Sequence, residues 1–176
     1  ANSIQATESQ ISQAEAKALA YEQKLKEQEE NITALKAKLA EEIRMAELAS
    51  QSSWRDISEV SFAEGDRYLL ANLIYCEAGG ESYAGQVAVG SVVMNRVLSS
   101  VYPNTVTGVI YQSGQFSPVA SGRLALALSE GRATSGCYKA ADEVMKGTTN
   151  VGNCVYFRTP VEGINPKYTI GGHIFY

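Results

Sequence analysis

The stretch around which the chain is organised runs from Leu69 to Glu81 and reads LLANLIYCEAGGE. Its apolar residues recur at the spacing of one helix face, and Asp66 stands where a side chain can cap the first turn. Gly79–Gly80 predicts the end of this helix, because glycine tolerates the left-handed conformation that commonly closes a helix. Glu77 therefore falls in the last turn of a largely apolar helix.

The position of Glu77 is unfavourable for a negative charge. The helix dipole disfavours an anion at the C-terminal end by roughly 0.3–1 kcal/mol, and apolar neighbours disfavour ionisation further. Both effects raise the pKa of the carboxyl group, which is what a general acid working near neutral pH requires. The alternative interpretation is a surface glutamate at a frayed helix end.

The composition excludes several classes of function. The chain has 176 residues, is 45% hydrophobic and carries a net charge of −4, which is typical of a globular protein and argues against nucleic-acid binding. We expect no membrane span, because no apolar run approaches the ~18–20 residues that one needs, and the N-terminus shows no signal peptide. With three cysteines and the single histidine His173, we expect neither a metal site nor any other cofactor.

Residues 1–50 have the composition of a long helix. They contain no glycine or proline, and apolar residues recur every seven positions, at Ile4, Ile11, Ala18, Leu25, Ile32 and Leu39. A second row lies three residues further on and is mixed, since it includes Gln28 and Glu42. The pattern predicts a coiled-coil helix over residues 1–50, paired with a second copy, another protein, more of a longer chain or the globular domain.

The rest of the chain predicts one α+β domain over residues 66–176, after a linker at 51–65. We expect it to be mainly helical with a small antiparallel sheet. Ser82 and Thr105 are placed to cap two of the helices. We interpret Asn95 and Arg96 as capping the end of the first of these two and neutralising its dipole, with substrate contact as the alternative. The expected helices are Tyr83 to about Leu98, Val106–Tyr111, a segment from Leu124 that ends at Gly131, and Cys137–Lys146. The expected strands are Asn153–Arg158 and Thr169–Tyr176.

The loops of this domain suit carbohydrate recognition. The chain has ten tyrosines against four phenylalanines, and tyrosine rings stack on sugars while their hydroxyls form hydrogen bonds. A polar loop at Gln112–Pro118 offers further hydrogen-bonding groups. A glycosidase that uses two carboxylates needs a second acid, and Glu81, Asp142 and Glu162 are available.

Several motifs in order resemble the spore cortex-lytic (SleB-type) cell-wall hydrolase domain. They cover Leu70–Gly90, Val92–Val97, Pro103–Thr105, Gly108–Gln112, Gln115–Pro118, Val155–Phe157 and Gly172–Tyr176. The resemblance implies a lysozyme-like fold and a peptidoglycan substrate. It also implies lytic transglycosylase chemistry, in which one glutamate cleaves the MurNAc–GlcNAc bond and leaves a 1,6-anhydro-MurNAc end. No metal or cofactor is required.

The same resemblance assigns roles to individual residues. The catalytic glutamate falls on Glu77, and Glu81 either orients the substrate or braces the Gly79–Gly80 turn. We interpret His173 as structural. Substrate contacts are expected from Glu81, Gln112, Gln115, Phe116, Ser117 and Tyr156.

Two features depart from the family pattern. The heptad segment replaces the peptidoglycan-binding repeat of many relatives, and it is expected to form a homodimer or to cover the cleft until a partner moves it. Cys137 and Cys154 would form a disulfide if the protein is exported to the cell wall, as we expect, with Cys76 left buried. The alternatives are a muramidase or an amidase acting on peptidoglycan, or a non-catalytic glycan-binding scaffold.

Overall fold

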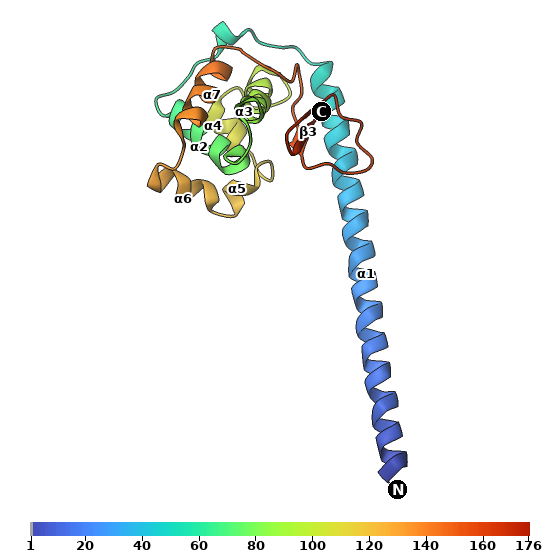
Figure 1. Cartoon of the computed structure of the whole chain (residues 1–176). Coiled ribbons are helices and arrows are strands. Elements are labelled where there is room, and N and C mark those ends of the chain that lie inside the picture. Colours follow the sequence, from blue (N-terminus) through green and yellow to red (C-terminus); the bar gives the residue numbers. More distant parts are fainter. Residues whose placement is uncertain (1) are drawn as a thin grey trace. The chain divides into compact units, whose positions relative to one another are not determined.

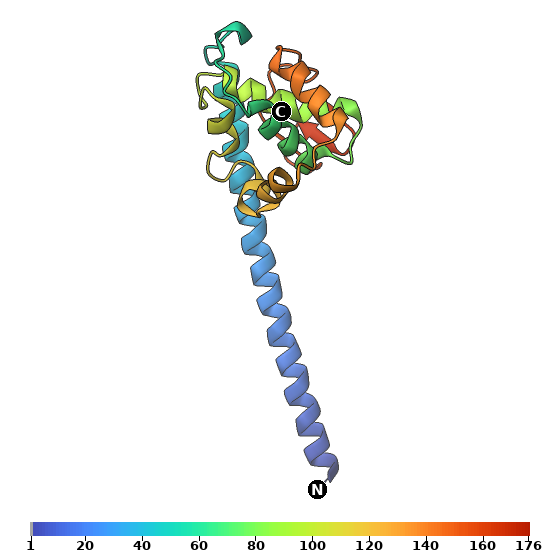
Figure 2. The same cartoon turned by 90° about the vertical axis from the view of Figure 1, so that its left-hand side faces the viewer.

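The computed structural model describes the backbone of residues 2–176 and the side chains of residues 7–176, so the side chain of Ile4 lies outside the described residues. The chain divides into two compact units, the first ending at Glu41 and the second comprising Glu42–Tyr176. The predicted long N-terminal helix is confirmed as α1 (Asn2–Ser50), which is unbroken (Figures 1 and 2). Within the described range, no helix is both long enough and apolar enough to cross a membrane.

Apart from Leu39, which is 6% exposed, the apolar side chains of the first unit are exposed at the heptad positions. Ile11, Leu25 and Ile32 are 53%, 51% and 52% exposed, and Tyr21 of the second row is 72% exposed. A stripe of this kind is left in water when a helix stands alone. Pairing of this stripe with another helix in a coiled coil therefore stays a prediction.

The last turns of α1 are part of the second unit and enter its core. The residues that do so are Met45, Ala46 and Ala49, the last fully buried. The segment expected to be a linker contains a short 3-10 helix, η1 (Ile57–Glu59), and packs Trp54 and Val60 against the same core. Trp54 also forms an isolated antiparallel bridge with Ser99.

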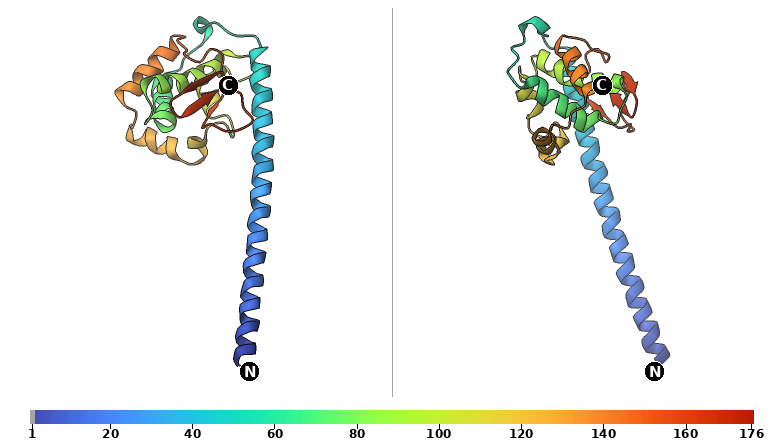
Figure 3. Two further views of the ribbon diagram at one scale, coloured as in Figure 1. Left: turned by 45° about the vertical axis from the view of Figure 1, so that its right-hand side comes forward. Right: turned by 60° about the vertical axis from the view of Figure 1, so that its left-hand side comes forward.

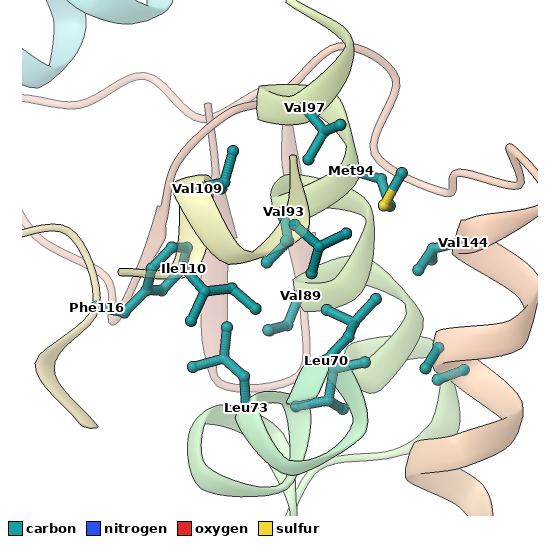
Figure 4. Packing of buried hydrophobic residues seen from close by; sticks show 14 of the residues in the cluster. Leu70, Leu73, Val89, Val93, Met94, Val97, Val109, Ile110, Phe116 and Val144 are labelled. Carbon is teal, nitrogen blue, oxygen red and sulfur yellow. The ribbon is translucent and has the colours of Figure 1, made fainter. Parts of the chain in front are cut away.

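Three helices build most of the core. They are α2 (Asp66–Ala78), α3 (Tyr83–Leu98) and α7 (Ser135–Met145). As expected from its apolar sequence, α3 is buried nearly all round and contacts both of the others. Figure 4 shows Val89, Val93 and Val97 of α3 in one cluster with Leu70 of α2 and Val144 of α7. A side chain at Gly90 would meet Ile74 Cδ1 and Val144 Cγ2 at 3.1 Å, so glycine permits this close packing.

Three shorter helices complete the helical part. These are α4 (Val106–Ile110), α5 (Ser117–Ala120) and α6 (Arg123–Glu130). Ser82 and Thr105 cap α3 and α4 as predicted, each accepting a hydrogen bond from a backbone N–H three residues ahead. The sequence-based prediction missed α5, because four residues around Pro118 carry too little pattern to separate a helical turn from a loop.

The sheet has three strands where two were predicted. They are β1 (Phe157–Arg158), β2 (Tyr168–Ile170) and β3 (His173–Phe175), all antiparallel in the order β1-β3-β2, and Figure 3 shows them beside the helices of the second unit. The second expected strand, Thr169–Tyr176, is wrong as one strand because a turn at Gly171–Gly172 folds it into a hairpin. Gly171 has a φ of +57°, which favours glycine.

Two predictions about the ends of α2 are corrected. Asp66 does not cap the helix but is its first residue, and its carboxylate accepts a hydrogen bond from the backbone N–H of Ala63 at 2.8 Å. The helix ends after Ala78 as expected, but Gly79 has right-handed angles, with a φ of −59°. A side chain at Gly79 would lie 2.5 Å from the carbonyl oxygen of Tyr75, so close approach explains this glycine better than left-handed geometry does.

The expected disulfide is absent, since all three cysteines are free. Cys137 lies in the main core cluster, where its sulfur is 3.2 Å from Thr134 Oγ1. Cys154 lies in a separate cluster with Ala88 and Phe175. Cys76, expected to be buried, is partly exposed.

Candidate active site

Glu77 occupies the last turn of α2, where the sequence placed it, and its side chain is half-buried. Burial raises the pKa of its carboxyl group above the ordinary range, and the positive charge of Arg123 opposes part of that rise. The protonated form is therefore stabilised at a helix end that already disfavours a negative charge. These are the surroundings of a carboxyl group that can donate a proton.

Arg123, the first residue of α6, is the cation beside Glu77. Its guanidinium donates to Ser117 Oγ at 3.2 Å, to Ser121 Oγ at 3.3 Å and to the carbonyl oxygen of Cys76 at 3.4 Å. Through these contacts it ties the start of α5 to the last turn of α2, so the predicted residue Ser117 contacts the same arginine whose charge acts on Glu77. Sequence reasoning missed Arg123, because a single arginine 46 positions after Glu77 carries no local signal.

A second arginine, Arg96 of α3, gathers three more of the predicted residues. It is 2% exposed, and its Nη1 donates to Gln115 Oε1 at 2.8 Å. Its guanidinium carbon lies 5.2 Å from the ring centre of Phe116 and 4.6 Å from that of Tyr156. Phe116 and Tyr156 are only 5% and 8% exposed, so their rings mainly support Arg96.

Asn95 and Arg96 do not cap α3, contrary to their interpretation from the sequence. The side-chain amide of Asn95 donates to the carbonyl oxygens of Gly152 and Cys154, both at 2.8 Å. The Nε of Arg96 donates to the carbonyl oxygen of Val155 at 2.7 Å. Adjacent polar residues of the central helix thus hold the segment that leads into β1.

Glu81 braces a turn, but a different one from that expected. Its Oε2 accepts a hydrogen bond from the N–H of Gly172 at 3.3 Å, and its Oε1 lies 3.7 Å from His173 Nδ1. The β2–β3 hairpin is therefore held by a carboxylate from the turn that precedes α3, about 90 residues away in the chain. His173 packs edge-on against Phe157 with ring centres 5.3 Å apart, as a structural residue does.

The end of α1 reaches the Arg96 cluster through two tyrosines. The rings of Tyr156 and Tyr176 are stacked with centres 5.5 Å apart. The hydroxyl of Tyr176 donates to Glu42, and Arg158 Nη1 lies 3.6 Å from the same carboxylate oxygen. Glu42 belongs to the second unit and has its partners there, which explains why a glutamate occupies a position of the second heptad row.

The remaining predicted residue, Gln112, follows α4 and is half-buried. Its side-chain oxygen is buried without a hydrogen-bond partner among the described residues, which leaves an acceptor available. The described part of the chain contains no group of three or more His, Cys, Asp or Glu side chains that could hold a metal ion.

Comparisons with known proteins place this site in context. A family model described as Cell Wall Hydrolase matches residues 80–176, a range that starts just after Glu77. The spore cortex-lytic enzyme of Bacillus cereus (strain ATCC 14579) is 39% identical over 99 residues, or 56% of this chain and 36% of that protein. The enzyme of the same name from Bacillus subtilis (strain 168) is 33% identical over 121 residues, or 65% and 38%. The chain thus spans little more than a third of the length of these relatives.

Two solved structures are similar to this chain over about two thirds of its length. The catalytic domain of the Bacillus cereus SleB protein superposes with a TM-score of 0.58 at 34% identity, covering 69% of this chain and 96% of that one. The catalytic domain of the germination-specific lytic transglycosylase SleB from Bacillus anthracis gives 0.56 at 35% identity, covering 65% and 96%. The expected α+β fold with a small antiparallel sheet is confirmed.

Proposed function

Because the chain belongs to the cell wall hydrolase family, we propose that it cleaves the glycan strands of peptidoglycan as a lytic transglycosylase, at the bacterial cell wall outside the cytoplasm. The observation that carries the proposal is Glu77, a half-buried carboxyl group whose pKa is raised at the end of α2. The name of the Bacillus anthracis neighbour supports the choice of transglycosylation over hydrolysis.

One carboxyl group is sufficient for this reaction. Protonated Glu77 donates its proton to the glycosidic oxygen as the bond between that oxygen and C1 of muramic acid breaks. The resulting carboxylate then takes the proton of the C6 hydroxyl of the same sugar while the C6 oxygen bonds to C1. The products are a 1,6-anhydro-muramic end and a free hydroxyl on the neighbouring sugar, and Glu77 is protonated again.

The surroundings of the other acids favour this mechanism over a muramidase with two carboxylates. Glu81 is engaged with the β2–β3 hairpin. Asp142 accepts two hydrogen bonds from Arg67 on the surface, at 2.6 and 3.1 Å. Glu162 is exposed on the loop between β1 and β2. An amidase that depends on zinc would need several imidazole or carboxylate ligands, and His173 is packed between aromatic rings beside Glu81.

The deciding experiment is mass spectrometry of the muropeptides released from purified peptidoglycan. We expect 1,6-anhydro-muramic ends from the native protein, and a loss of about 100-fold or more with Glu77→Gln. Glu162→Gln is the matched control, because it makes the same change at an exposed position. Reducing muramic ends would indicate a muramidase, free stem peptides an amidase, and binding without products a scaffold; each result would contradict the proposal.

We further propose that the exposed stripe of residues 7–35 pairs with a second copy of the chain in parallel. In a parallel coiled coil, Lys17 and Lys24 would face Glu22 and Glu29 of the partner helix, whereas an antiparallel pair of copies would bring like charges together. All four residues are exposed. Sedimentation should show a dimer that Lys17→Glu with Lys24→Glu weakens, and a monomeric native chain would contradict this pairing.

A further inference from the structure

A cavity of about 430 Å³ lies between the end of α2 and α6, beside the candidate acid. Tyr75, Cys76 and Gly79–Gly80 line it on the α2 side. Arg123 and Leu126 line it from α6, and Arg132 completes the wall. Arg123 lines the cavity and its charge also acts on the carboxyl group of Glu77, so a ligand bound to this arginine would lie near the candidate acid. The reaction proposed above does not use the cavity.

The cavity carries more positive charge than its neighbours neutralise. Arg132 pairs with Glu130 at 2.6 Å. Arg123 has no carboxylate within ion-pair distance among the residues that the structure describes, and it donates only to two serine hydroxyls and one carbonyl oxygen. A guanidinium has five N–H groups, so two remain for a ligand. On a chain with a net charge of −4, this is a local site for an anion.

The other walls suit a small peptide. Gly80 has open space where a side chain would stand, so a ligand can approach the backbone closely there. Leu126 is 45% exposed and offers an apolar contact. Burial raises the pKa of the Cys76 thiol, so this group stays neutral and does not compete for the arginines.

From this geometry we infer that the cavity binds a carboxylate of the peptide stem attached to the muramic acid under cleavage. The inference rests on the proposed function, because that peptide extends from the lactyl group of the same sugar whose C1 reacts. Arg123 and Arg132 recognise the carboxylate, since guanidinium groups bind carboxylates through paired hydrogen bonds. Leu126 contacts the alanine methyl groups of the stem. The enzyme thereby selects glycan strands that carry peptides over bare strands.

The test compares two substrates, namely glycan strands with intact stems and strands stripped of them by an amidase. For the native protein we expect kcat/KM to be about tenfold higher with stems. Arg132→Gln should reduce that ratio toward one. Arg67→Gln is the matched control, because this exposed arginine pairs with Asp142 on the surface and should leave the ratio unchanged. Equal rates on both substrates, or an equal fall on both with Arg132→Gln, would overturn the inference.

A binding measurement keeps the test independent of catalysis. Cys76 lines the cavity, whereas Cys137 and Cys154 are buried, so alkylation by a maleimide reports on occupancy. A free stem peptide should slow alkylation of Cys76 in the native protein, and less so in Arg132→Gln. If neither glycan is cleaved, the proposed function fails, but protection of Cys76 still decides whether the cavity binds the peptide. The absence of protection would refute the inference.

Discussion

Replacing Arg96 by lysine or by methionine should reveal what the buried guanidinium contributes to stability. The side chain donates to Gln115 at 2.8 Å and to the carbonyl oxygen of Val155 at 2.7 Å. It also lies over the rings of Tyr102, Phe116 and Tyr156. Hydrogen bonds to charged groups contribute about 1.5–3 kcal/mol each, and desolvated cation–π contacts about 2 kcal/mol.

Lysine should be the worse replacement, although it keeps the charge. One ammonium group cannot reach both acceptors with the geometry of the planar fork, and it remains buried, so we expect Arg96→Lys to lower the free energy of unfolding by about 3 kcal/mol. Methionine leaves the Val155 carbonyl unpaired, at about 1–3 kcal/mol. It also removes a buried charge, which offsets much of that cost. For Arg96→Met we expect a net loss of about 1 kcal/mol.

Urea unfolding followed by the fluorescence of Trp54, the single tryptophan, measures this difference in the second unit. A buried lysine has a lowered pKa, so the unfolded state binds more protons and the stability of Arg96→Lys should rise with pH relative to the native protein. Arg96→Met should show no such slope. If lysine were within 1 kcal/mol of the native protein, or methionine were the worse of the two, the reasoning would be refuted.

Two further predictions concern charges and glycines near the site. The protonated form of Glu77 acts first and burial raises its pKa, so activity should fall as pH rises through that raised value. Arg123→Gln removes the charge that opposes the rise and should move the falling limb of the kcat profile to higher pH. A shift to lower pH would contradict the assignment. Gly171→Ala should cost at least 1–2 kcal/mol of unfolding free energy, because its φ of +57° is strained for alanine and the new methyl group would overlap the carboxylate of Glu81. Gly131→Ala, at a similar φ of +62° and with no contact closer than 3.6 Å, measures the strain alone. Equal thermal unfolding midpoints for these two variants would show that contact with Glu81 does not matter.

Local sequence patterns predicted the helices well. The expected range from Tyr83 to about Leu98 is the helix observed, and its Ser82 cap is confirmed. The reason is physical, because nearly continuous apolar residues after a capping serine allow few alternatives. Glu77 was placed correctly in its helical turn for the same reason, since the apolar spacing of α2 and the following glycines fix where that turn lies.

What the sequence did not reveal depends on contacts between distant residues. The hairpin at Gly171–Gly172 interrupts a run of strand-forming residues, and the carboxylate that holds it comes from Glu81. Arg96 was interpreted as a basic residue that caps its helix, but it donates a hydrogen bond to Gln115, a loop residue 19 positions further on. The expected pairing of Cys137 with Cys154 failed because the two side chains pack in separate clusters. None of these distances is encoded in local periodicity.

The anchoring of Glu42 and Ala49 has a consequence for how this architecture can be recombined in evolution. The helical arm cannot be exchanged at residue 50, because its last turns supply core side chains and a partner for the Tyr176 hydroxyl. A fusion that preserves the second unit must join before Glu42. Since α1 is unbroken, each residue inserted at such a junction would shift the heptad rows by about 100° around the axis of this helix. Insertions in multiples of seven residues would therefore be the ones that natural selection most readily tolerates.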